Sequence, residues 1–383
     1  MRILQIAPFY PPHIGGIEFH VEALSRKLAE AGHEVVVYTS NVPRTTNSET
    51  VNGVQVRRFA APFLPLNNPF LPTLLPALLR DNKFDVVHAH GHFHTSTTFV
   101  VISNLFRRRP IVLTCHGAIL EYRGWKRGLE RVFNKSVGRW TLRSVDRVIA
   151  LTPTQEEMLE GLGARRERII VIPSWVELPA IVSARNAAGF RAAHKLGDKR
   201  LVLYVGRLLP VKGLAYLIEA AKQAQTSPTV MLIGDEAPGY AGCRESLVQH
   251  VKRLDMEKQV LFLGRFARED LEAAYEAADL FVLPSLGEGL PLALLEAMAY
   301  GKCGIATDVP GNRDVIRDGW NGSLVEARDS VALARKIDVL LGDDGLRARL
   351  GAQARRDIEQ NYSSASVLNK IVDVYREVRE IRR

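Results

Sequence analysis

The sequence predicts an α/β protein of two domains, each with a doubly wound parallel sheet, that face each other across a cleft. Three observations support this fold class. The 383-residue chain is longer than one hydrophobic core usually fills. Apolar β-rich runs alternate with amphipathic helical segments, as they do where helices cover both faces of a parallel sheet. This alternation restarts after residues 179–199, which therefore mark the boundary between the domains.

The first half of the chain contains a series of short β-rich runs, several of them almost entirely apolar. Strands that are covered on both faces have this composition. Helical patterns lie between several of the runs, and in residues 17–31 Phe19, Val21, Leu24 and Leu28 recur at roughly helical spacing. The expected strands read MRILQIA, HEVVVYT, VQVRRFA, FDVVHAH, PIVLTCHG, DRVIALT and IIVIP.

The second half repeats the pattern. Strands LVLYVGR, TVMLIGD, VLFLG, LFVLPS and CGIAT alternate with helices LAYLIEAAKQA, SLVQHVKRL, DLEAAYEAA and PLALLEAMAYG. We therefore expect domains at residues 1–178 and 179–365. A last helical run at residues 366–383 follows an irregular segment at Tyr362 and could belong to either domain, so it could pack back on the first.

Composition excludes several classes of protein. Apolar residues make up 46% and charged residues 24%, as in globular proteins, and no run approaches the roughly 18 apolar residues of a membrane-spanning helix. Residues 1–7 read as a strand and lack the features of an export signal, so a cytoplasmic location is expected. Cys115, Cys243 and Cys303 lie far apart and indicate neither a disulfide framework nor a structural zinc site.

The net charge of +9 is unevenly distributed along the chain. Residues 107–147 hold eleven lysines and arginines against three acids, a local excess of eight positive charges. The chain therefore has a local basic surface rather than a generally basic composition.

The segment SLGEGLPLALLEAMAYG, residues 285–301, combines a glycine-rich turn with the start of a helix. Pro291 suits the first helical position, where its missing N–H costs nothing. The backbone N–H groups of the turn and helix then point together beyond the carboxyl end of the preceding strand. Such a place favours an anion, above all a phosphate.

Two acids flank this turn. Glu288 precedes the expected helix and Glu296 lies near its second turn. A carboxylate beside a phosphate site is costly unless it accepts hydrogen bonds, and sugar hydroxyls are suitable donors. The pair therefore suggests a phosphorylated sugar, such as a nucleotide sugar. The simpler interpretation is that both glutamates are exposed surface residues, as most glutamates are.

Other turns have the same character. In YVGRLLPVKG a strand ends at Gly206, and Arg207 and Lys212 follow near the start of a helix, where they could neutralise a diphosphate. Near the chain start, Gly15 and Gly16 form a second turn at which a phosphate could approach the backbone. Neither a G-x-G-x-x-G motif nor an intact P-loop is present.

Together these motifs resemble the retaining glycosyltransferases of family 4, whose GT-B fold has two facing Rossmann-like domains. The resemblance covers nearly the whole chain. Its motifs are Gly15-Gly16 after the first strand, His116-Gly117 at the end of a strand, GRLLPVKG, LFLGRF, and the E-x7-E pair Glu288 and Glu296 with GLPLALLEAMA.

The resemblance implies a role for each matching residue. Arg207 and Lys212 would clamp the donor diphosphate, Glu296 would hold the ribose hydroxyls, and Glu288 would contact the transferred sugar. His116 would lie beside the anomeric carbon, and Gly264 to Phe266 would touch the nucleobase. The implied catalytic residues are His116, Glu288, Arg207 and Lys212; the implied donor-binding residues are Gly15, Gly16, Arg207, Lys212, Gly264, Arg265, Phe266, Glu288, Gly289, Leu290, Pro291, Leu292 and Glu296.

The implied reaction moves a hexose of the mannose or glucose type from a GDP- or UDP-linked donor to an acceptor, with retention of anomeric configuration. The leaving diphosphate itself would help to deprotonate the acceptor, so no carboxylate nucleophile is needed, and stabilising the leaving group would do most of the work. No D-x-D motif is present, and we expect activity without a metal ion or another cofactor. The chain departs from the family at residues 173–177, PSWVE, where Asn-Gly-Val-Asp is usual.

The run HAHGHFH places His88, His90, His92 and His94 at alternate positions. On a strand this spacing would put all four on one face and could suggest a metal site, but the run enters a turn at Gly91 and no acid or cysteine completes the set. We therefore predict no metal site and expect cleft-edge and loop histidines, one of which could bind acceptor.

The basic segment reads as an amphipathic helix over residues 124–147. Apolar residues recur at helical spacing opposite Arg127, Arg131, Lys135 and Arg139. The apolar side could simply pack on its own domain. Together with the apolar, proline-rich run at residues 61–79, the helix could instead bind an anionic membrane surface. The enzyme would then be peripheral on the inner face of the cell membrane, with a lipid-linked or glycan acceptor, as in glycolipid or polysaccharide biosynthesis.

Other functions fit parts of the sequence. Nucleotide-sugar epimerases or hydrolases and pyridoxal-phosphate-dependent sugar phosphorylases share the expected fold. A basic nucleic-acid-binding protein is a further alternative, although no RNP-like aromatic motif or zinc finger accompanies the charge. We therefore expect no nucleic-acid partner.

Overall fold

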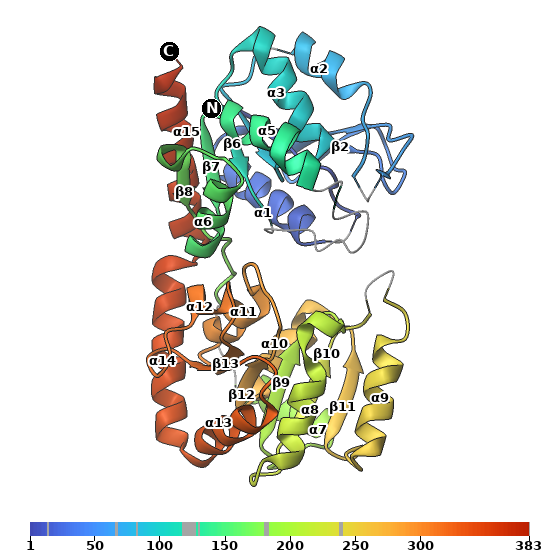
Figure 1. Cartoon of the computed structure of the whole chain (residues 1–383), viewed down its shortest axis with the longest axis vertical. Helices are drawn as coiled ribbons and strands as arrows, with labels where there is room; N and C mark the ends of the chain where they lie inside the picture. Colours follow the sequence, from blue (N-terminus) through green and yellow to red (C-terminus); the bar gives the residue numbers. More distant parts are fainter. Residues whose placement is uncertain are drawn as a thin grey trace. The chain divides into compact units, whose positions relative to one another are not determined.

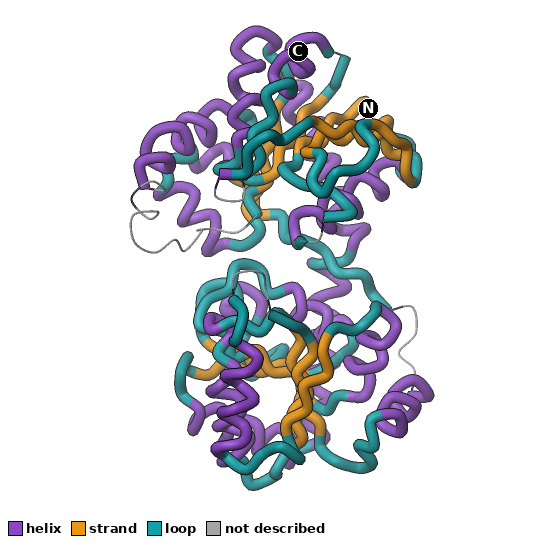
Figure 2. The backbone as a smooth tube through the Cα atoms, turned by 90° about the vertical axis from the view of Figure 1, so that its right-hand side faces the viewer, coloured by secondary structure: helices purple, strands orange, loops and turns teal. Residues whose placement is uncertain are grey.

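The computed structural model describes residues 1–13, 15–65, 68–81, 83–116, 128, 131–179, 184–236 and 240–382. The chain divides into two compact units. The first unit contains Met1–Ser174 and Ala365–Arg383, and the second contains Trp175–Ser364. In both, strands are covered by helices (Figure 2).

The first unit is built on an eight-stranded sheet with the order β3-β4-β2-β1-β5-β6-β7-β8. All neighbouring strands are parallel except β3, which runs antiparallel to β4 at one edge. The strands are β1 Arg2–Ile6, β2 Glu34–Ser40, β3 Ser48–Val51, β4 Val54–Phe59, β5 Val86–His90, β6 Ile111–Thr114, β7 Arg147–Ala150 and β8 Ile169–Val171.

Helices connect these parallel strands. Helix α1 packs against β2, α3 against β5, and α6 against β7 and β8. Thr152 caps α6 by accepting a hydrogen bond from the Gln155 N–H, and Pro153 takes the first helical position. The helices are α1 Gly16–Glu30, α2 Leu74–Arg80, α3 Thr95–Arg107, the π-helix η2 Asn134–Gly138, α5 Arg139–Ser144, α6 Pro153–Gly161 and the 3-10 helix η3 Arg166–Arg168.

The last helix, α15 (Ser364–Ile381), belongs almost entirely to the first unit and runs beside β7 (Figure 1). Its Glu377 pairs with Arg147 of β7, and Arg382, just beyond the helix, pairs with Asp146 at 2.8 Å. The hydroxyl of Tyr375, which is fully buried, bonds to His88 of β5. These contacts attach the chain's last segment to the sheet that its first segment begins.

The second unit contains an entirely parallel six-stranded sheet with the order β11-β10-β9-β12-β13-β14. Its strands are β9 Leu201–Val205, β10 Thr229–Ile233, β11 Val260–Gly264, β12 Leu280–Leu283, β13 Cys303–Thr307 and β14 Ser323–Val325. Its helices are α7 Ala184–Ala193, η4 Pro210–Lys212, α8 Leu214–Gln223, α9 Cys243–Arg253, α10 Arg268–Ala277, α11 Leu292–Ala299, α12 Asn312–Val315, α13 Ser330–Gly342 and α14 Asp344–Asn361.

Two helix-covered sheets, one parallel except for β3 and the other entirely parallel, confirm the predicted α/β fold class. Two local expectations need correction. Pro291 lies one position before α11, as its N-cap, and not at the first helical residue. Residues 131–144 are helical, but a π-helical segment at Asn134–Gly138 interrupts the regular spacing. The predicted amphipathic helix began at residue 124, and residues 124–127, 129 and 130 lie outside the described part of the chain.

Candidate functional site

The predicted donor residues of the second unit lie at the end of β11, in the loops that follow β9, β11 and β12, and in helix α11. In a parallel sheet the carboxyl ends of all strands share one edge, so these loops gather there. Contacts between them are close: the Leu286 N–H donates to the Val211 carbonyl at 2.7 Å, and a Cβ on Gly213 would lie 2.1 Å from the Pro284 carbonyl oxygen. Gly213 has φ +64°, which also favours glycine.

Lys212 and Glu288 form an ion pair at the centre of this loop group. The Lys212 Nζ lies 2.6 Å from Glu288 Oε1, and the Ser285 hydroxyl donates to the same oxygen at 2.6 Å. The Glu288 side chain is only 9% exposed, which rules out a free surface glutamate. Because the pair is shielded from solvent, its members hold each other in place.

Arg207 lies in the loop after β9 and is exposed. Its carbonyl accepts a hydrogen bond from the Tyr204 hydroxyl at 2.9 Å, which fixes the backbone at this position. Within the described part of the chain, the guanidinium forms no hydrogen bond or ion pair. It is therefore available to an anionic ligand.

Glu296 of α11 is held differently from Glu288. Its Oε2 accepts a hydrogen bond from the Tyr275 hydroxyl of α10 at 2.9 Å. Burial raises the pKa of the Glu296 carboxyl, although the bond from Tyr275 opposes this shift. The pKa of Tyr275 is raised well above 10 by its own burial and by Glu296, so it remains a hydrogen-bond donor.

The turn between Glu288 and α11 presents its backbone. Among the described residues, no partner accepts a hydrogen bond from the N–H groups of Gly289 and Leu290. The Pro291 carbonyl accepts the first helical bonds, from Leu294 and Leu295. Unpaired N–H groups at the start of a helix bind anions well.

The segment predicted to touch a nucleobase follows β11. Gly264 has φ +72° and its carbonyl accepts from the Gly234 N–H at 2.7 Å. Arg265 is exposed, and its Nε lies 3.9 Å from Asp235 Oδ2. The ring of Phe266 stacks against the ring of His194. The structure thus brings the loops after β10 and β11 together.

The predicted glycine turn of the first unit precedes α1. Gly15 is the N-cap of α1 in an extended conformation, and a Cβ there would lie 2.2 Å from the Glu18 carboxylate. Gly16 has open space where its Cβ would be. Glu18, which is buried and 2.9 Å from His13 Nδ1, lies at the helix start that an anion could occupy.

His88 and His90 lie in β5, whereas His92 and His94 follow it in a turn and at the N-cap of α3, as predicted for loop histidines, but all four are buried rather than exposed at an edge. His88 and His90 are fully buried, and His92 and His94 nearly so. Burial lowers the pKa of each, to about 3 for His88 and about 4 for His92, so they are neutral at physiological pH. Strand alternation places His88 and His90 on one face of the sheet, as expected, and the strand ends before His92 and His94.

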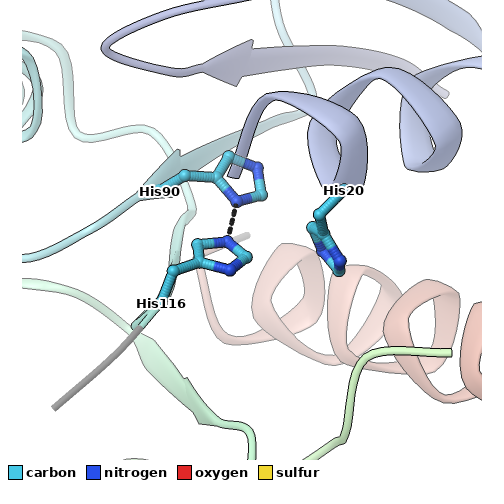
Figure 3. Close-up of side chains that lie close together, drawn as sticks. All are labelled: His20, His90 and His116. Carbon is cyan, nitrogen blue, oxygen red and sulfur yellow. Dashed lines mark hydrogen bonds between the residues drawn. The ribbon is translucent and has the colours of Figure 1, made fainter. Parts of the chain in front are cut away.

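His90 does meet two other histidines. His20 of α1 and His116, after β6, lie close to it, and nitrogen atoms of the three are all within 4.8 Å of one another (Figure 3). This number of nitrogens could hold a transition metal. However, His90 Nδ1 and His116 Nε2 already bond to each other at 2.9 Å. Gly117, paired with His116 in the sequence motif, lies outside the described residues.

The sequence did not point to several of the contact residues. Ser285 and Tyr275 hold the two glutamates, and Gln5 holds His90, but serines and tyrosines are too common to stand out. Gln5 did leave a signal, since it is a polar residue in the middle of the apolar strand RILQI. In the unusual segment at residues 173–177, the Ser174 hydroxyl lies 3.3 Å from His20 Nδ1.

The chain was compared with known protein families, curated proteins and solved structures. Residues 14–178 match the family "Glycosyltransferase Family 4" and residues 188–357 match "Glycosyl transferases group 1". A D-inositol 3-phosphate glycosyltransferase of Salinispora tropica is 30% identical over 95% of this chain and 81% of its own. A phosphatidyl-myo-inositol mannosyltransferase of Mycobacterium leprae is 29% identical over 99% of this chain and 97% of its own. The crystal structure of Anabaena HepE in complex with UDP has a TM-score of 0.83 at 21% identity and covers 98% of this chain and all of its own.

The fold and the relatives together define a GT-B-fold glycosyltransferase that uses a nucleotide-sugar donor. The chain belongs to the group 1 glycosyltransferases of family 4, which confirms the predicted family. Within the described residues, no helix is both long and apolar enough to cross a membrane.

Proposed function

We propose that this enzyme is a retaining, metal-independent hexosyltransferase that takes mannose or glucose from a GDP- or UDP-linked donor. The observation that carries the proposal is the loop group of the second unit. It combines the exposed Arg207, the Lys212–Glu288 pair, the half-buried Glu296, and the N–H groups of Gly289 and Leu290, which have no acceptor among the described residues. Arg207, Lys212 and the backbone N–H groups suit a diphosphate. The carboxylates of Glu288 and Glu296 suit two sets of sugar hydroxyls.

In the proposed reaction, the bond between the anomeric carbon and the diphosphate breaks, and a bond to the acceptor oxygen forms on the same face of the sugar. The leaving diphosphate takes the acceptor's proton. Arg207 and Lys212 would stabilise the charge that develops on the diphosphate. Glu296 would hold the ribose, and Glu288 and His116 would contact the transferred sugar. Gly15 and Gly16 would let the diphosphate approach the backbone.

The relatives support the choice of sugars without deciding between them. The Mycobacterium leprae relative is a mannosyltransferase by name, and HepE has been crystallised with UDP and with UDP-glucose. GDP- and UDP-linked sugars both contain a ribose joined to a diphosphate, so the same loop group suits either donor. Binding of the free nucleotides and of their sugars distinguishes the base and the hexose.

A thermal-shift and calorimetric panel of UDP, GDP, ADP and their sugars tests this proposal. We expect one nucleotide to bind clearly, with the same affinity in EDTA, because arginine, lysine and backbone N–H groups replace a metal at the diphosphate. Glu296→Ala should bind that nucleotide at least tenfold more weakly, since it loses the ribose contacts.

Glu269→Ala, an exposed acid in the first turn of α10, is the matched control and should bind like the wild type. Binding that disappears in EDTA would contradict metal independence, and no binding by any nucleotide would contradict the donor site. Release of free nucleotide and sugar, without an acceptor product, would favour an epimerase or hydrolase.

We further propose that the first unit binds an anionic membrane surface and that the acceptor is lipid-linked or a glycan. Exposed apolar and cationic residues occur together here. Leu105 and Phe106, at the end of α3, are 64% and 73% exposed and are followed by the exposed Arg107 and Arg108. Helix α3 contacts α5, where Trp140 is exposed beside Arg139. This combination is typical of membrane-surface binding.

Vesicle flotation tests the membrane proposal. The protein should float with vesicles containing phosphatidylserine, less so at high salt, and not with pure phosphatidylcholine. Arg108→Gln and Arg139→Gln should each weaken binding about fivefold, because each arginine near an anionic surface contributes about 1 kcal/mol. Val339→Ser, at an exposed apolar position on α13, should change nothing. Equal binding to both kinds of vesicle, or to neither, would contradict a lipid surface as partner.

A further inference from the structure

A buried polar network crosses one face of the first sheet. Gln5 of β1 is paired in register with His88 of β5, and His90 with Thr114 of β6. Their apolar neighbours, such as Leu4 and Val87, belong to the core cluster on the opposite face. The network consists of Gln5, His88, His90, Thr114, His116 and Tyr375.

The hydrogen bonds of Gln5 determine where the protons lie. Its Oε1 is 2.8 Å from His90 Nε2, and its Nε2 donates to the Tyr375 hydroxyl at 3.2 Å. A carboxamide oxygen only accepts, so His90 Nε2 must carry a hydrogen. A neutral imidazole has one N–H, and therefore His90 Nδ1 is an acceptor.

The position of the hydrogen on His90 also determines the position of the hydrogen on His116. Its Nε2 lies 2.9 Å from His90 Nδ1, so it must be the donor in that bond. The Nδ1 atom of His116 then keeps its lone pair. Burial lowers the pKa of both His90 and His116 well below 6.5, so both rings are neutral at physiological pH, as this assignment requires.

The other branch of the network agrees with this direction. Because the Tyr375 hydroxyl accepts from Gln5, it can donate to His88 Nδ1 at 2.6 Å. His88 Nε2–H then donates to the Thr114 hydroxyl at 2.7 Å. Each of these five bonds therefore joins one donor to one acceptor, as a stable buried network requires.

We propose that Gln5 and His90 are positioning residues that hold His116 in its Nε2–H tautomer, so that Nδ1 accepts a hydrogen bond from a sugar hydroxyl. The role at the sugar rests on the proposed function, whereas the tautomer does not. A hydroxyl that donates to Nδ1 is oriented by it, and the opposite tautomer would present an N–H and could not accept that hydroxyl proton.

Long-range proton–nitrogen NMR of the full chain with 15N-labelled histidine tests the tautomer directly, because protonated and unprotonated ring nitrogens differ widely in shift. His116→Gln and His90→Gln assign the signals. We expect the wild-type protein to carry the hydrogen of His116 on Nε2. Gln5→Leu, which removes the acceptor for His90, should convert His116 to a mixture of tautomers. Thr114→Val, at the end of the other branch, should leave the His116 signal unchanged.

Kinetics test the role of the tautomer. Gln5→Leu should lower kcat on the order of tenfold or more, with little change in the KM for the donor, as expected when an imidazole takes the wrong tautomer. Gln5→Glu keeps an oxygen acceptor opposite His90 and should recover most of this loss. Unchanged kcat in Gln5→Leu, with the tautomer altered, would overturn the positioning role.

Two spectroscopic results would overturn the assignment itself. One is a wild-type His116 protonated on Nδ1, which would mean that the network runs in the opposite direction. The other is stoichiometric zinc binding that shifts the signals of His20, His90 and His116 together, which would make the cluster a metal site. The expected spectrum in a protein that transfers no sugar would support the tautomer and overturn the proposed function instead.

Discussion

Lys212→Met should lower kcat for sugar transfer by about 10²–10³, because it removes a fixed positive charge from the proposed diphosphate site. The loss should be larger in kcat than in donor binding, since negative charge on the leaving group grows in the transition state. Steady-state kinetics with the nucleotide sugar identified by the binding panel would measure both. Lys222→Met, at an exposed lysine on the neighbouring helix α8, should have wild-type kinetics.

A second variant separates the loss of charge at the diphosphate from the loss of the ion pair between Lys212 and Glu288. Lys212→Met also leaves the shielded Glu288 carboxylate without its cation, which is costly in itself. The double variant Lys212→Met/Glu288→Gln removes that unpaired charge. We expect its kcat to stay low. Recovery toward the wild-type rate in the double variant would show that Lys212 serves Glu288 and not the diphosphate.

Gly213→Ala should both destabilise the second unit and abolish nucleotide binding. The new Cβ would lie 2.1 Å from the Pro284 carbonyl oxygen, which belongs to the backbone and cannot rotate away. The residue also has φ +64°, which costs an alanine about 1–2 kcal/mol. Relief of the clash would displace the loop that carries Ser285 and Glu288. We expect a free energy of unfolding lower by roughly 2–5 kcal/mol, by adding the cost of overpacking to that of strain.

Gly197→Ala separates these two causes. Gly197 has φ +54°, but no atom lies within 4 Å of the position that its Cβ would take, so the variant carries only the backbone strain. Thermal and urea unfolding should show a loss of about 1–2 kcal/mol with nucleotide binding retained. Equal losses in the two variants would mean that the approach of Gly213 to Pro284 is not rigid in solution.

The strands could be predicted because most are buried on both faces and therefore read as apolar runs. The exceptions show the limit of this signal. Strand β3, SETV, lies at the edge of its sheet and is mostly polar, so its composition is that of a loop. Strand β14, SLV, has only three residues, which is too short for a recognisable apolar run. The π-helical segment at Asn134–Gly138 was also missed, because one extra residue per turn leaves no mark on composition.

For the candidate site, the sequence indicated the charged residues but not their partners. Glu288, Glu296, Arg207 and Lys212 stand beside glycine turns and strand ends, which have recognisable local patterns. The pairing of Lys212 with Glu288 joins loops 76 residues apart in the chain. The bond from Gln5 to His90 depends in the same way on strand register, which is a property of the folded sheet and cannot be read from either segment alone.

The return of α15 to the first unit sets an order for folding during synthesis. All of residues 175–364 leave the ribosome before Tyr375 does, so the second unit can fold while the first still lacks its last helix. The usual order, in which the N-terminal part of a chain is finished first, is thereby reversed. A nascent chain that stopped at residue 364 would hold a complete second unit, but Gln5 and His88 would have lost their tyrosine partner. Tyr375, which is made after the whole of the second unit, thus completes a network that Gln5 begins.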